Sequence, residues 1–333
     1  MRFANEGSHC VALHWYKGKR ILITGGAGYL ATTVVGLLQG VDCHIVRLTR
    51  PGAAFAPVTG AADIESATGD VRERATWECT LAGTDVVFHF AAQTSTYVAN
   101  EDPRADLDSN VMPMLNLLET CRQHGWRPTV LFSSTATVAG IPACLPVDET
   151  HPDNPVTVYD LHKLMAEHYL KYYVNQGIVR GGILRLSNIY GPGPKSSRSD
   201  RGILNQMICR ALAGEALTVY GQGDYLRDYL YVEDAAKAFL EAAERIEAVN
   251  GRHFVVGSGI GYTIAQALNL IAERVALKTG KQVTVTHIDP PAPQSPIESR
   301  NFVANSWRFH QATGWRPCHS FTEGVDRTIE AFL

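Results

Sequence analysis

The 333-residue sequence lacks several patterns that define other classes of protein. Its seven cysteines are odd in number, scattered and without a C-x-x-C pair, which argues against a disulfide framework and against a zinc site. No apolar run approaches the roughly 18–20 residues needed to cross a bilayer. Glu6, His9 and His14 interrupt the amino-terminal stretch where a signal peptide needs a continuous apolar core. We therefore expect a protein of a reducing, cytoplasmic compartment, with no membrane anchor and no metal site.

A strong excess of charge of either sign is also lacking. Charged residues make up 19% of the chain, apolar residues make up 45%, and the formal net charge is −3. A surface that binds nucleic acid or an anionic membrane requires a larger imbalance. The composition is that of an ordinary globular protein, long enough for one large domain or two smaller ones. We expect neither a nucleic acid nor a membrane as a partner.

Short apolar runs alternate with helical patterns through the first two-thirds of the chain. These runs are rich in β-branched residues and end on glycine or polar residues, as buried parallel strands do. They cover residues 20–25, 43–48, 85–91, 129–134 and 181–187. Strand–helix alternation of this kind predicts an α/β fold with a Rossmann-like, doubly wound parallel sheet.

The character of the sequence changes near Gly191, where a Gly- and Pro-rich loop begins. A second Pro-rich loop covers residues 289–300, and long loops of this kind are often functional. We predict a dinucleotide-binding Rossmann domain at 19–190. The remaining residues, 191–333, are predicted to be mainly substrate-binding, with some segments returning to the sheet. Residues 1–18 are interpreted as an amino-terminal extension whose role the sequence leaves open.

A glycine-rich turn follows the first predicted strand. Gly25, Gly26 and Gly28 stand between the strand and a helical run that starts near Tyr29. Glycines at these places let backbone N–H groups approach a pyrophosphate at a helix N-terminus, where the helix dipole favours negative charge. Ala31, three residues after the last glycine, still allows the helix to pack closely on the strand. Strand, turn and helix together predict a dinucleotide site.

The end of the second predicted strand lacks the carboxylate that binds the adenosine ribose of NAD. The sequence VRLTRPG offers Arg47 and Arg50 instead. An arginine at this turn can pair with the 2′-phosphate of NADP, and stacking of Arg50 on adenine is the alternative. Asp70, after a third predicted strand, is a candidate acceptor for the adenine amino group. The sequence leaves the choice between NAD and NADP open.

A tyrosine and a lysine lie four residues apart in the segment VYDLHK, as Tyr159 and Lys163. In a helix these two share one face, and a nearby ammonium favours the phenolate, which lowers the pKa of a tyrosine from about 10. Such a tyrosine suits acid–base catalysis in an alcohol–ketone interconversion. Thr135 stands where a predicted strand enters a polar loop at the carboxyl edge of the sheet, where ligands bind. Its hydroxyl is a candidate to orient the substrate oxygen.

Six motifs in the same order resemble the extended short-chain dehydrogenase/reductase family, especially its nucleotide-sugar epimerase and dehydratase group. They are TGGAGYLA (24–31), HFAAQT (89–94), SST (133–135), the Tyr159/Lys163 pair, LRLSNIYGPG (184–193) and LRDYLYVEDAAKA (226–238). The resemblance runs from about Arg20 to the C-terminus. It implies a nucleotide-sugar substrate, a bound NAD or NADP, and a homodimer.

The resemblance assigns roles to individual residues. It implies Tyr159 as the acid/base, Lys163 as the group that lowers its pKa and binds the nicotinamide ribose, and Thr135 as the partner of the reacting sugar oxygen. With Tyr159 and Lys163, the candidate cofactor-binding residues are Gly25, Gly28, Tyr29, Leu30, Arg50, Asp70, Val71, Phe90, Ala91, Ala92 and Ser133. The candidate substrate-binding residues besides Thr135 are Gln93, Asn188, Tyr220, Arg227 and Arg300, with Arg227 expected to clamp the diphosphate.

The residues after Thr135 bear on the choice of reaction. Hexose 4,6-dehydratases of this family usually have Asp-Glu there, whereas this chain has Ala136 and Thr137. The resemblance therefore favours a 4-epimerase over a dehydratase. In that reaction Tyr159 takes the proton of the 4-hydroxyl while hydride passes from C4 to the nicotinamide. The rotated 4-ketose then receives hydride on its opposite face.

An NADPH-dependent nucleotide-sugar 4-ketoreductase is the alternative. Ala139 stands where the epimerases usually have a tyrosine, and Arg50 fits NADP. The same three catalytic residues serve both reactions. A dinucleotide-binding protein without activity is disfavoured, because such proteins typically lose the tyrosine or the lysine, and both Tyr159 and Lys163 are present.

Other polar residues near these motifs are predicted to be structural. His89 lies in an apolar strand and is interpreted as a core or loop-anchoring histidine. Asn110 is expected to serve packing near the start of a helix. Asp228 and Asp234 are expected to fix a loop and to cap the helix that follows.

Overall fold

The computed structural model describes residues 11–52, 55, 59–194, 202–290 and 296–333. The first ten residues of the predicted extension lie outside the described residues. Of the remainder, a short 3-10 helix, η1 (Leu13–Tyr16), buries Tyr16, whose hydroxyl donates to the Leu240 carbonyl at 2.8 Å. This part of the extension therefore packs against the core of the dinucleotide domain.

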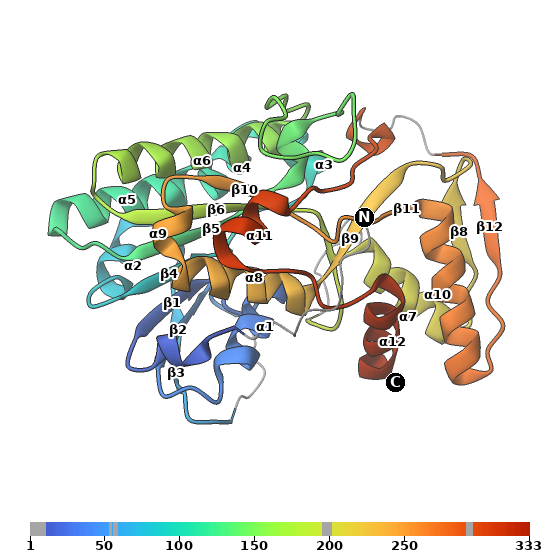
Figure 1. Ribbon diagram of the computed structural model, residues 1–333, viewed down its shortest axis with the longest axis horizontal. Helices are drawn as coiled ribbons and strands as arrows, with labels where there is room; N and C mark the ends of the chain where they lie inside the picture. The colour runs from blue at the N-terminus through green and yellow to red at the C-terminus, as the bar shows by residue number, and fades with distance from the viewer. Residues whose placement is uncertain (1–10, 53–54, 56–58, 195–201, 291–295) are drawn as a thin grey trace.

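A seven-stranded sheet forms the centre of the larger part of the molecule (Figure 1), and all its neighbouring strands pair in parallel. Continuous runs of buried side chains explain six of these strands, because helices cover both faces, whereas the edge strand β3 (Asp63–Thr68) is mostly exposed. The structure confirms the predicted Rossmann-like α/β fold. The spatial order is β10 (His253–Val256), β6 (Arg180–Leu186), β5 (Thr129–Thr135), β4 (Val86–His89), β1 (Arg20–Thr24), β2 (His44–Thr49) and β3 (Asp63–Thr68).

Two layers of helices cover the sheet. One apolar cluster joins the sheet to α1 (Tyr29–Leu38), α8 (Val232–Glu244), α9 (Ile246–Val249) and α11 (Trp307–Thr313). The other joins it to α2 (Arg74–Thr80), α5 (Met112–His124) and α6 (Val158–Asn175), against which α3 (Thr96–Glu101) and α4 (Pro103–Asn110) pack. Gly125 ends α5 in the left-handed conformation, at φ 69°, as its place in the sequence predicts.

The smaller part of the molecule lies beside the carboxyl edge of the large sheet (Figure 1). Its apolar cluster includes Tyr190, Ile208 and Phe321. Its strands are β7 (Asn188–Tyr190), β9 (Leu226–Tyr231) and β11 (Gly261–Thr263) in one sheet, and β8 (Leu217–Tyr220) and β12 (Val285–Ile288) in another. Its helices are α7 (Ile203–Ala213), α10 (Ile264–Thr279), α12 (Phe321–Phe332) and the 3-10 helix η3 (Pro296–Ser299).

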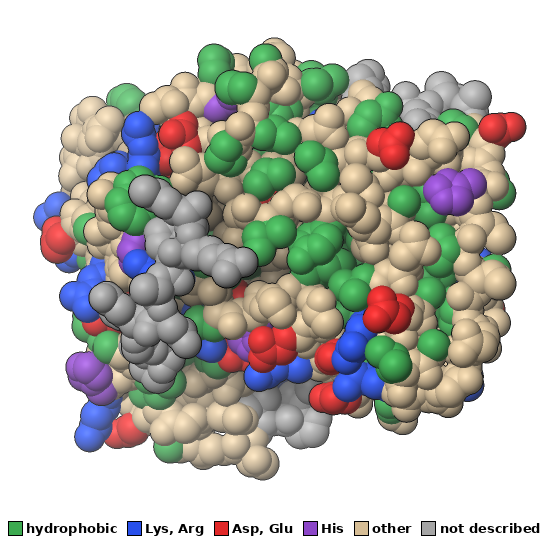
Figure 2. All heavy atoms as spheres, turned by 45° about the vertical axis from the view of Figure 1, so that its right-hand side comes forward, with side chains coloured by type: hydrophobic (Ala, Val, Ile, Leu, Met, Phe, Trp, Pro, Cys, Tyr) green, Lys and Arg blue, Asp and Glu red, His purple; other side chains and the backbone are tan. Residues whose placement is uncertain are grey.

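Charges of both signs are interspersed on the face shown in Figure 2, and no extended patch of a single sign is seen there. Among the described helices, none is both long and apolar enough to cross a membrane. The described residues also contain no cluster of three or more His, Cys, Asp or Glu side chains suited to hold a metal ion.

Candidate active site

The segments that carry the candidate residues follow the ends of neighbouring parallel strands. The glycine turn follows β1, Arg50 follows β2, Asp70 follows β3, and Ala91 follows β4, while Thr135 is the last residue of β5. Because all these strands run in the same direction, the segments meet at one edge of the sheet. The carboxyl edge is where open α/β sheets bind ligands.

The glycine turn fits tightly between the segments beside it. A Cβ atom at Gly25, which has φ +65°, would lie 3.0 Å from the Ala91 nitrogen, and one at Gly26 would lie 2.9 Å from Arg47. The Gly28 N–H donates to the Gly25 carbonyl at 2.7 Å, and Gly28 caps α1. Only glycine fits these places, and the turn therefore presents bare backbone at a helix N-terminus.

Tyr29 and Leu30, at the start of α1, differ in role. The Tyr29 hydroxyl donates to the Gly191 carbonyl and accepts from the Asn205 amide at 3.3 Å, so it joins the glycine turn to the loop before α7. A Cβ at Gly193 would lie 2.3 Å from the Tyr29 ring, and the ring therefore packs on that loop. Leu30 is buried in the core, which leaves its backbone as the group that faces a cofactor.

The two arginines at the end of β2 also differ. Arg47 is buried, its guanidinium donates to the Gly26 carbonyl at 3.1 and 3.2 Å, and it lies over the Phe55 ring. It therefore supports the glycine turn. Arg50 is exposed, and its charge contributes to lowering the pKa of Asp70, although the main cause is the hydrogen bonds from Arg72.

The Asp70 carboxylate is held by a bidentate pair with Arg72, with contacts of 2.6 to 3.0 Å. The Val71 carbonyl accepts from the indole of Trp77 at 2.8 Å. The contacts of Arg72 and Trp77 fix the turn after β3. The adenine contact predicted for Asp70 stays a prediction.

Thr24 organises the turn after β4. Its Oγ1 accepts from the Phe90 and Ala91 N–H groups at 3.1 Å each and lies 2.8 Å from Nδ1 of His89. Burial lowers the pKa of His89 to about 3, so the ring is neutral. Because the Phe90 and Ala91 N–H groups occupy both lone pairs of Thr24 Oγ1, the Thr24 hydroxyl donates its hydrogen bond to Nδ1 of His89. His89 is therefore a loop-anchoring histidine, as predicted. Ala91 and Ala92 are half-buried beside the glycine turn.

Phe90 and Ser133, two further cofactor candidates, take different positions. Phe90 packs edge-on against Phe239 of α8, with ring centroids 4.8 Å apart, and this places its ring toward the core. Ser133 is half-buried on β5, where it pairs with Leu184 of β6.

Thr157 caps α6 and sets Tyr159 and Lys163 in its first turns. Tyr159 is 9% exposed and Lys163 is 3% exposed. The Lys163 ammonium lies 4.1 Å from the centroid of the Phe132 ring on β5. Burial lowers the pKa of Lys163 to about 7, against the opposing charges of Glu167 and Asp106. The helix therefore brings a nearly buried phenol and a desolvated ammonium to the carboxyl edge.

Asp160 is a residue of the candidate site that the sequence reasoning missed. It follows Tyr159 and is fully buried. Its Oδ1 accepts a hydrogen bond from the Thr137 hydroxyl, whose oxygen lies 2.8 Å from Oγ1 of Thr135. Ala136 and Thr137, which follow Thr135, carry no carboxyl group, but α6 supplies one at Asp160. The spacing of Thr157 and Asp160 resembles a helix cap, which masks this signal.

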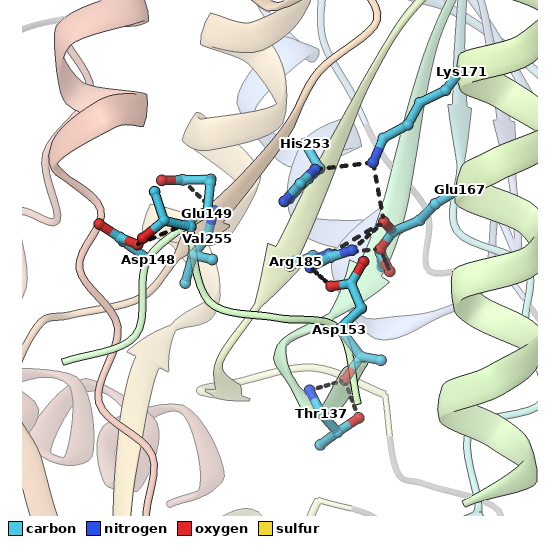
Figure 3. A network of polar contacts seen from close by, with 12 residues as sticks. Thr137, Asp148, Glu149, Asp153, Glu167, Lys171, Arg185, His253 and Val255 are labelled. Atoms are coloured by element: carbon cyan, nitrogen blue, oxygen red, sulfur yellow. Dashed lines mark hydrogen bonds and ion pairs between the residues drawn. The ribbon is translucent and has the colours of Figure 1, made fainter. Parts of the chain in front are cut away.

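A buried network of charges fixes the middle of α6 to the sheet (Figure 3). Glu167 accepts from Arg185 of β6 at 2.7 to 3.1 Å and from the Ser134 hydroxyl at 2.5 Å. Arg185 also donates to Asp153 at 2.5 Å, and Lys171 lies 3.8 Å from Glu167. Since Glu167 is one turn from Lys163, this network sets the position of the catalytic part of the helix.

Two buried arginines, both candidate substrate-binding residues, lie in contact with each other. Arg227 of β9 donates to the Arg300 carbonyl at 2.5 Å and to the Glu298 carbonyl at 2.8 Å. Arg300 donates to the Asn188 side chain at 3.5 Å. Burial lowers the pKa of Arg300 to about 10, and the like charge of Arg227 adds to the effect. The structure therefore brings Asn188, Arg227 and Arg300 together as a cationic site.

Two other substrate candidates are placed apart from this group. The Gln93 amide donates to Asp106 and to the Ser95 carbonyl, at 2.8 Å each, in a buried network with Asn110 and His162. Tyr220 ends β8 with 52% of its surface exposed. Their substrate contacts stay predictions.

The two aspartates predicted to be structural have separate outcomes. Asp228 accepts from the backbone N–H groups of Ser258, Gly259 and Ala304 at 2.8 to 3.0 Å, which confirms that it fixes a loop. The predicted helix-capping role of Asp234 was wrong. It lies inside the first turn of α8, and its carboxylate accepts from the N–H and ring of His319, 85 residues away, instead.

Ala139 also has a defined place. It is buried in an apolar cluster with Val147, Val255 and Phe302. Ala139 is thus a core residue at the end of the 3-10 helix η2 (Ala136–Ala139), which follows Thr135.

Comparison with known proteins decides the family. Residues 21–257 match the model of the NAD dependent epimerase/dehydratase family. The chain belongs to this family. It is therefore an NAD(P)-dependent enzyme, as the motifs imply.

Relatives of this epimerase/dehydratase are similar over nearly the whole chain. It is 28% identical to the UDP-glucose 4-epimerase of Mycolicibacterium smegmatis, over 94% of this chain and 98% of the relative. The structure of the Thermus thermophilus UDP-glucose 4-epimerase in complex with NAD is 30% identical, with a TM-score of 0.76, and the match covers 94% and 98% of the two chains. That of the Thermotoga maritima UDP-glucose 4-epimerase with UDP-glucose is 27% identical, with a TM-score of 0.82 and the same coverage.

The residues at the carboxyl edge fit a dinucleotide. The bare glycine turn at the N-terminus of α1 suits a pyrophosphate, and it has no room for a Cβ atom. Asp70 stands at the end of β3, and Lys163 stands at the far side, beyond β5, with its charge desolvated. The candidate cofactor-binding residues thus span the edge from β3 to α6.

Proposed function

We propose that this enzyme is a nucleotide-sugar 4-epimerase that acts on a UDP-hexose. The observation that carries the proposal is that one chain combines near-full-length similarity to UDP-glucose 4-epimerases with Thr135, Tyr159 and Lys163 at the carboxyl edge. The buried pair of Arg227 and Arg300 supports a diphosphate in the substrate, because guanidinium groups bind phosphate oxygens bidentately.

The chain supplies proton transfer and positioning. A bound nicotinamide would supply the acceptor and donor of the hydride at sugar C4. Tyr159 takes the proton of the 4-hydroxyl as a general base and gives a proton back when the alcohol forms again. Lys163 provides positive charge one helical turn from this phenol, which favours its ionised form. Thr135 hydrogen-bonds the oxygen that changes between hydroxyl and carbonyl.

The arginine pair holds the nucleotide part while the sugar turns over. Arg227 and Arg300 are only 5% and 9% exposed, and the one carboxylate paired with them among the described residues is Glu298, 3.8 Å from Arg227, so two like charges share one partner until a further anion binds. A diphosphate there anchors the substrate at a distance from C4. The sugar ring can then present either face to the nicotinamide without leaving the protein.

Interconversion of UDP-glucose and UDP-galactose by the purified protein is the direct test. We expect turnover without added dinucleotide, and mass spectrometry of the denatured protein should show released NAD. Tyr159→Phe should lower kcat by about 10²–10⁴-fold, as removal of an acid–base group does. Tyr172→Phe, on the exposed side of the same helix, is the matched control and should leave kcat unchanged.

The ketoreductase alternative makes a different prediction in the same assay. A protein that oxidises added NADPH with a 4-keto sugar nucleotide, and does not interconvert the two UDP-hexoses, would overturn the epimerase proposal. The use of Arg47 to hold Gly26 leaves exposed Arg50 as the arginine for a 2′-phosphate. We nevertheless favour NAD, because the matching family is NAD dependent and the Thermus thermophilus relative was solved in complex with NAD.

A further inference from the structure

A group of hydrogen bonds joins the glycine turn to the smaller part of the molecule. The Tyr29 hydroxyl, on the first residue of α1, donates to the Gly191 carbonyl and accepts from the Asn205 amide at 3.3 Å. Asn205, on α7, also donates to the Gly191 carbonyl at 2.8 Å and accepts from the Gly191 N–H at 3.2 Å. Both backbone polar groups of Gly191 are thus bonded, and helices from the two parts of the molecule supply the bonds.

The chain around Gly191 fits closely between its neighbours. Gly191 has φ +137°, a backbone conformation that other residues rarely adopt, and a Cβ there would lie 2.7 Å from Val232 and 2.9 Å from the Tyr231 ring. A Cβ at Gly193 would lie 2.3 Å from the Tyr29 ring. The segment after β7 therefore passes directly against this ring, so the ring and the hydroxyl of Tyr29 hold the same segment.

Gly191 directly follows the strand that carries a candidate substrate residue. That strand, β7, begins at Asn188, whose side chain accepts from Arg300 at 3.5 Å. It pairs along its whole length with β9, the strand of Arg227. A displacement of Gly191 is therefore passed to Asn188 and to the arginine pair. The bonds of Tyr29 thus set where these residues lie relative to the glycine turn.

We propose that Tyr29 is a positioning residue that, together with Asn205, holds the substrate side at the distance from the dinucleotide that hydride transfer requires. The proposal rests on the epimerase function above, in which the glycine turn holds the cofactor and Asn188 and the arginine pair hold the substrate. Rates of transfer depend steeply on this distance, and a misplacement of about 1 Å can cost about 10²-fold. In this role the Tyr29 side chain touches neither the sugar nor the nicotinamide.

The test uses three variants of the dinucleotide-loaded protein. Tyr29→Phe removes the hydroxyl and keeps the ring, and Asn205→Leu removes the side-chain bonds to Gly191 and to the tyrosine. Tyr16→Phe is the matched control, because the Tyr16 hydroxyl is also buried and also donates to a backbone carbonyl, at 2.8 Å, outside the candidate site. Thermal unfolding of each variant measures what the lost hydrogen bond contributes to stability.

We expect the kcat for interconversion of UDP-glucose and UDP-galactose to fall about three- to tenfold in Tyr29→Phe and about tenfold or more in Asn205→Leu. The bound dinucleotide and the dissociation constant of UDP, measured by calorimetry, should stay within about twofold, because the groups that bind each ligand remain. Hydrogen exchange in the peptide 188–194, measured by mass spectrometry, should become faster in both variants. Tyr16→Phe should change neither kcat nor this exchange.

Two results would overturn the inference while leaving the epimerase function standing. One is a kcat of Tyr29→Phe and of Asn205→Leu equal to that of the Tyr16→Phe control. The other is a loss of bound dinucleotide or of UDP affinity as large as the fall in kcat, because the two side chains would then serve binding instead of positioning. A wild-type protein that interconverts no UDP-hexose would instead overturn the proposed function, and with it this role of Tyr29.

Discussion

Helix α6 carries two groups of buried charge that are one turn apart and differ in their partners. In its middle, Glu167 is surrounded by Arg185, Lys171 and the Ser134 hydroxyl (Figure 3). In its first turns, the Lys163 ammonium is buried against the Phe132 ring, and among the described residues no carboxylate forms an ion pair with it. Opposite charges at Glu167 and Asp153 raise the pKa of Arg185 despite burial, whereas burial lowers that of Lys163.

The difference shows how one helix combines stability with function. A network in which every charge is paired holds the helix in one position, because any movement of the helix would break those pairs. A desolvated ammonium destabilises the free protein. It becomes useful when a phenolate and a bound ligand provide the negative charge and hydrogen bonds that the protein does not give it. We therefore expect that substitutions in the network around Glu167 destabilise the protein, whereas substitution of Lys163 stabilises it.

The largest effect is expected from breaking the network in the middle of α6. Arg185→Met leaves Glu167 and Asp153 without their main partner and should lower the free energy of unfolding by about 3–5 kcal/mol. Urea unfolding measures it. Arg180→Met is the matched control on the same strand: its pair with Glu247 is exposed, and its loss should cost about 1 kcal/mol or less. Equal losses in both variants would contradict the comparison.

An effect of opposite sign is expected at Lys163. Lys163→Met should abolish most turnover, yet raise the free energy of unfolding of the dinucleotide-free protein at neutral pH by about 1 kcal/mol or more. The pKa of Lys163 is about 7 in the folded protein and about 10.4 when unfolded, so between these values the unfolded chain binds more protons.

The pH dependence of that gain follows from the same values. Wild-type stability should rise with pH between about 7 and 10 through this group, and the gain from Lys163→Met should therefore be largest at or below pH 7 and shrink toward pH 10. Urea unfolding of both proteins at pH 6, 8 and about 9.5 measures the difference. A gain that grows with pH would show that Lys163 is not a desolvated cation.

The smallest effect is expected from Lys171, at the edge of the network. Its side chain is 22% exposed, 3.8 Å from Glu167 and 2.9 Å from His253. Lys171→Met should change the free energy of unfolding by less than about 1 kcal/mol and leave kcat unaltered, because Arg185 still neutralises Glu167. A loss as large as that of Arg185→Met would mean that the network acts as a single unit.

The sequence by itself determined the fold class and the local parts of the site. Continuous apolar runs predicted five of the seven parallel strands to within a residue or two, and Gly25 and Gly125 marked turns with a positive φ, which glycine adopts best. The spacing of Tyr159 and Lys163 placed both on one helix face. These features are local, because backbone geometry and helical period act over a few residues.

Only the tertiary structure decided which polar groups meet. Asp160 reaches Thr137, 23 residues earlier, and Arg185 pairs with Glu167 across the interface between strand and helix. Asp234 binds His319, 85 residues away, where the sequence predicted a helix cap. A buried hydrogen-bonding group must find a partner, and the packing of distant segments, which no local pattern encodes, determines which partner lies within 3 Å or so.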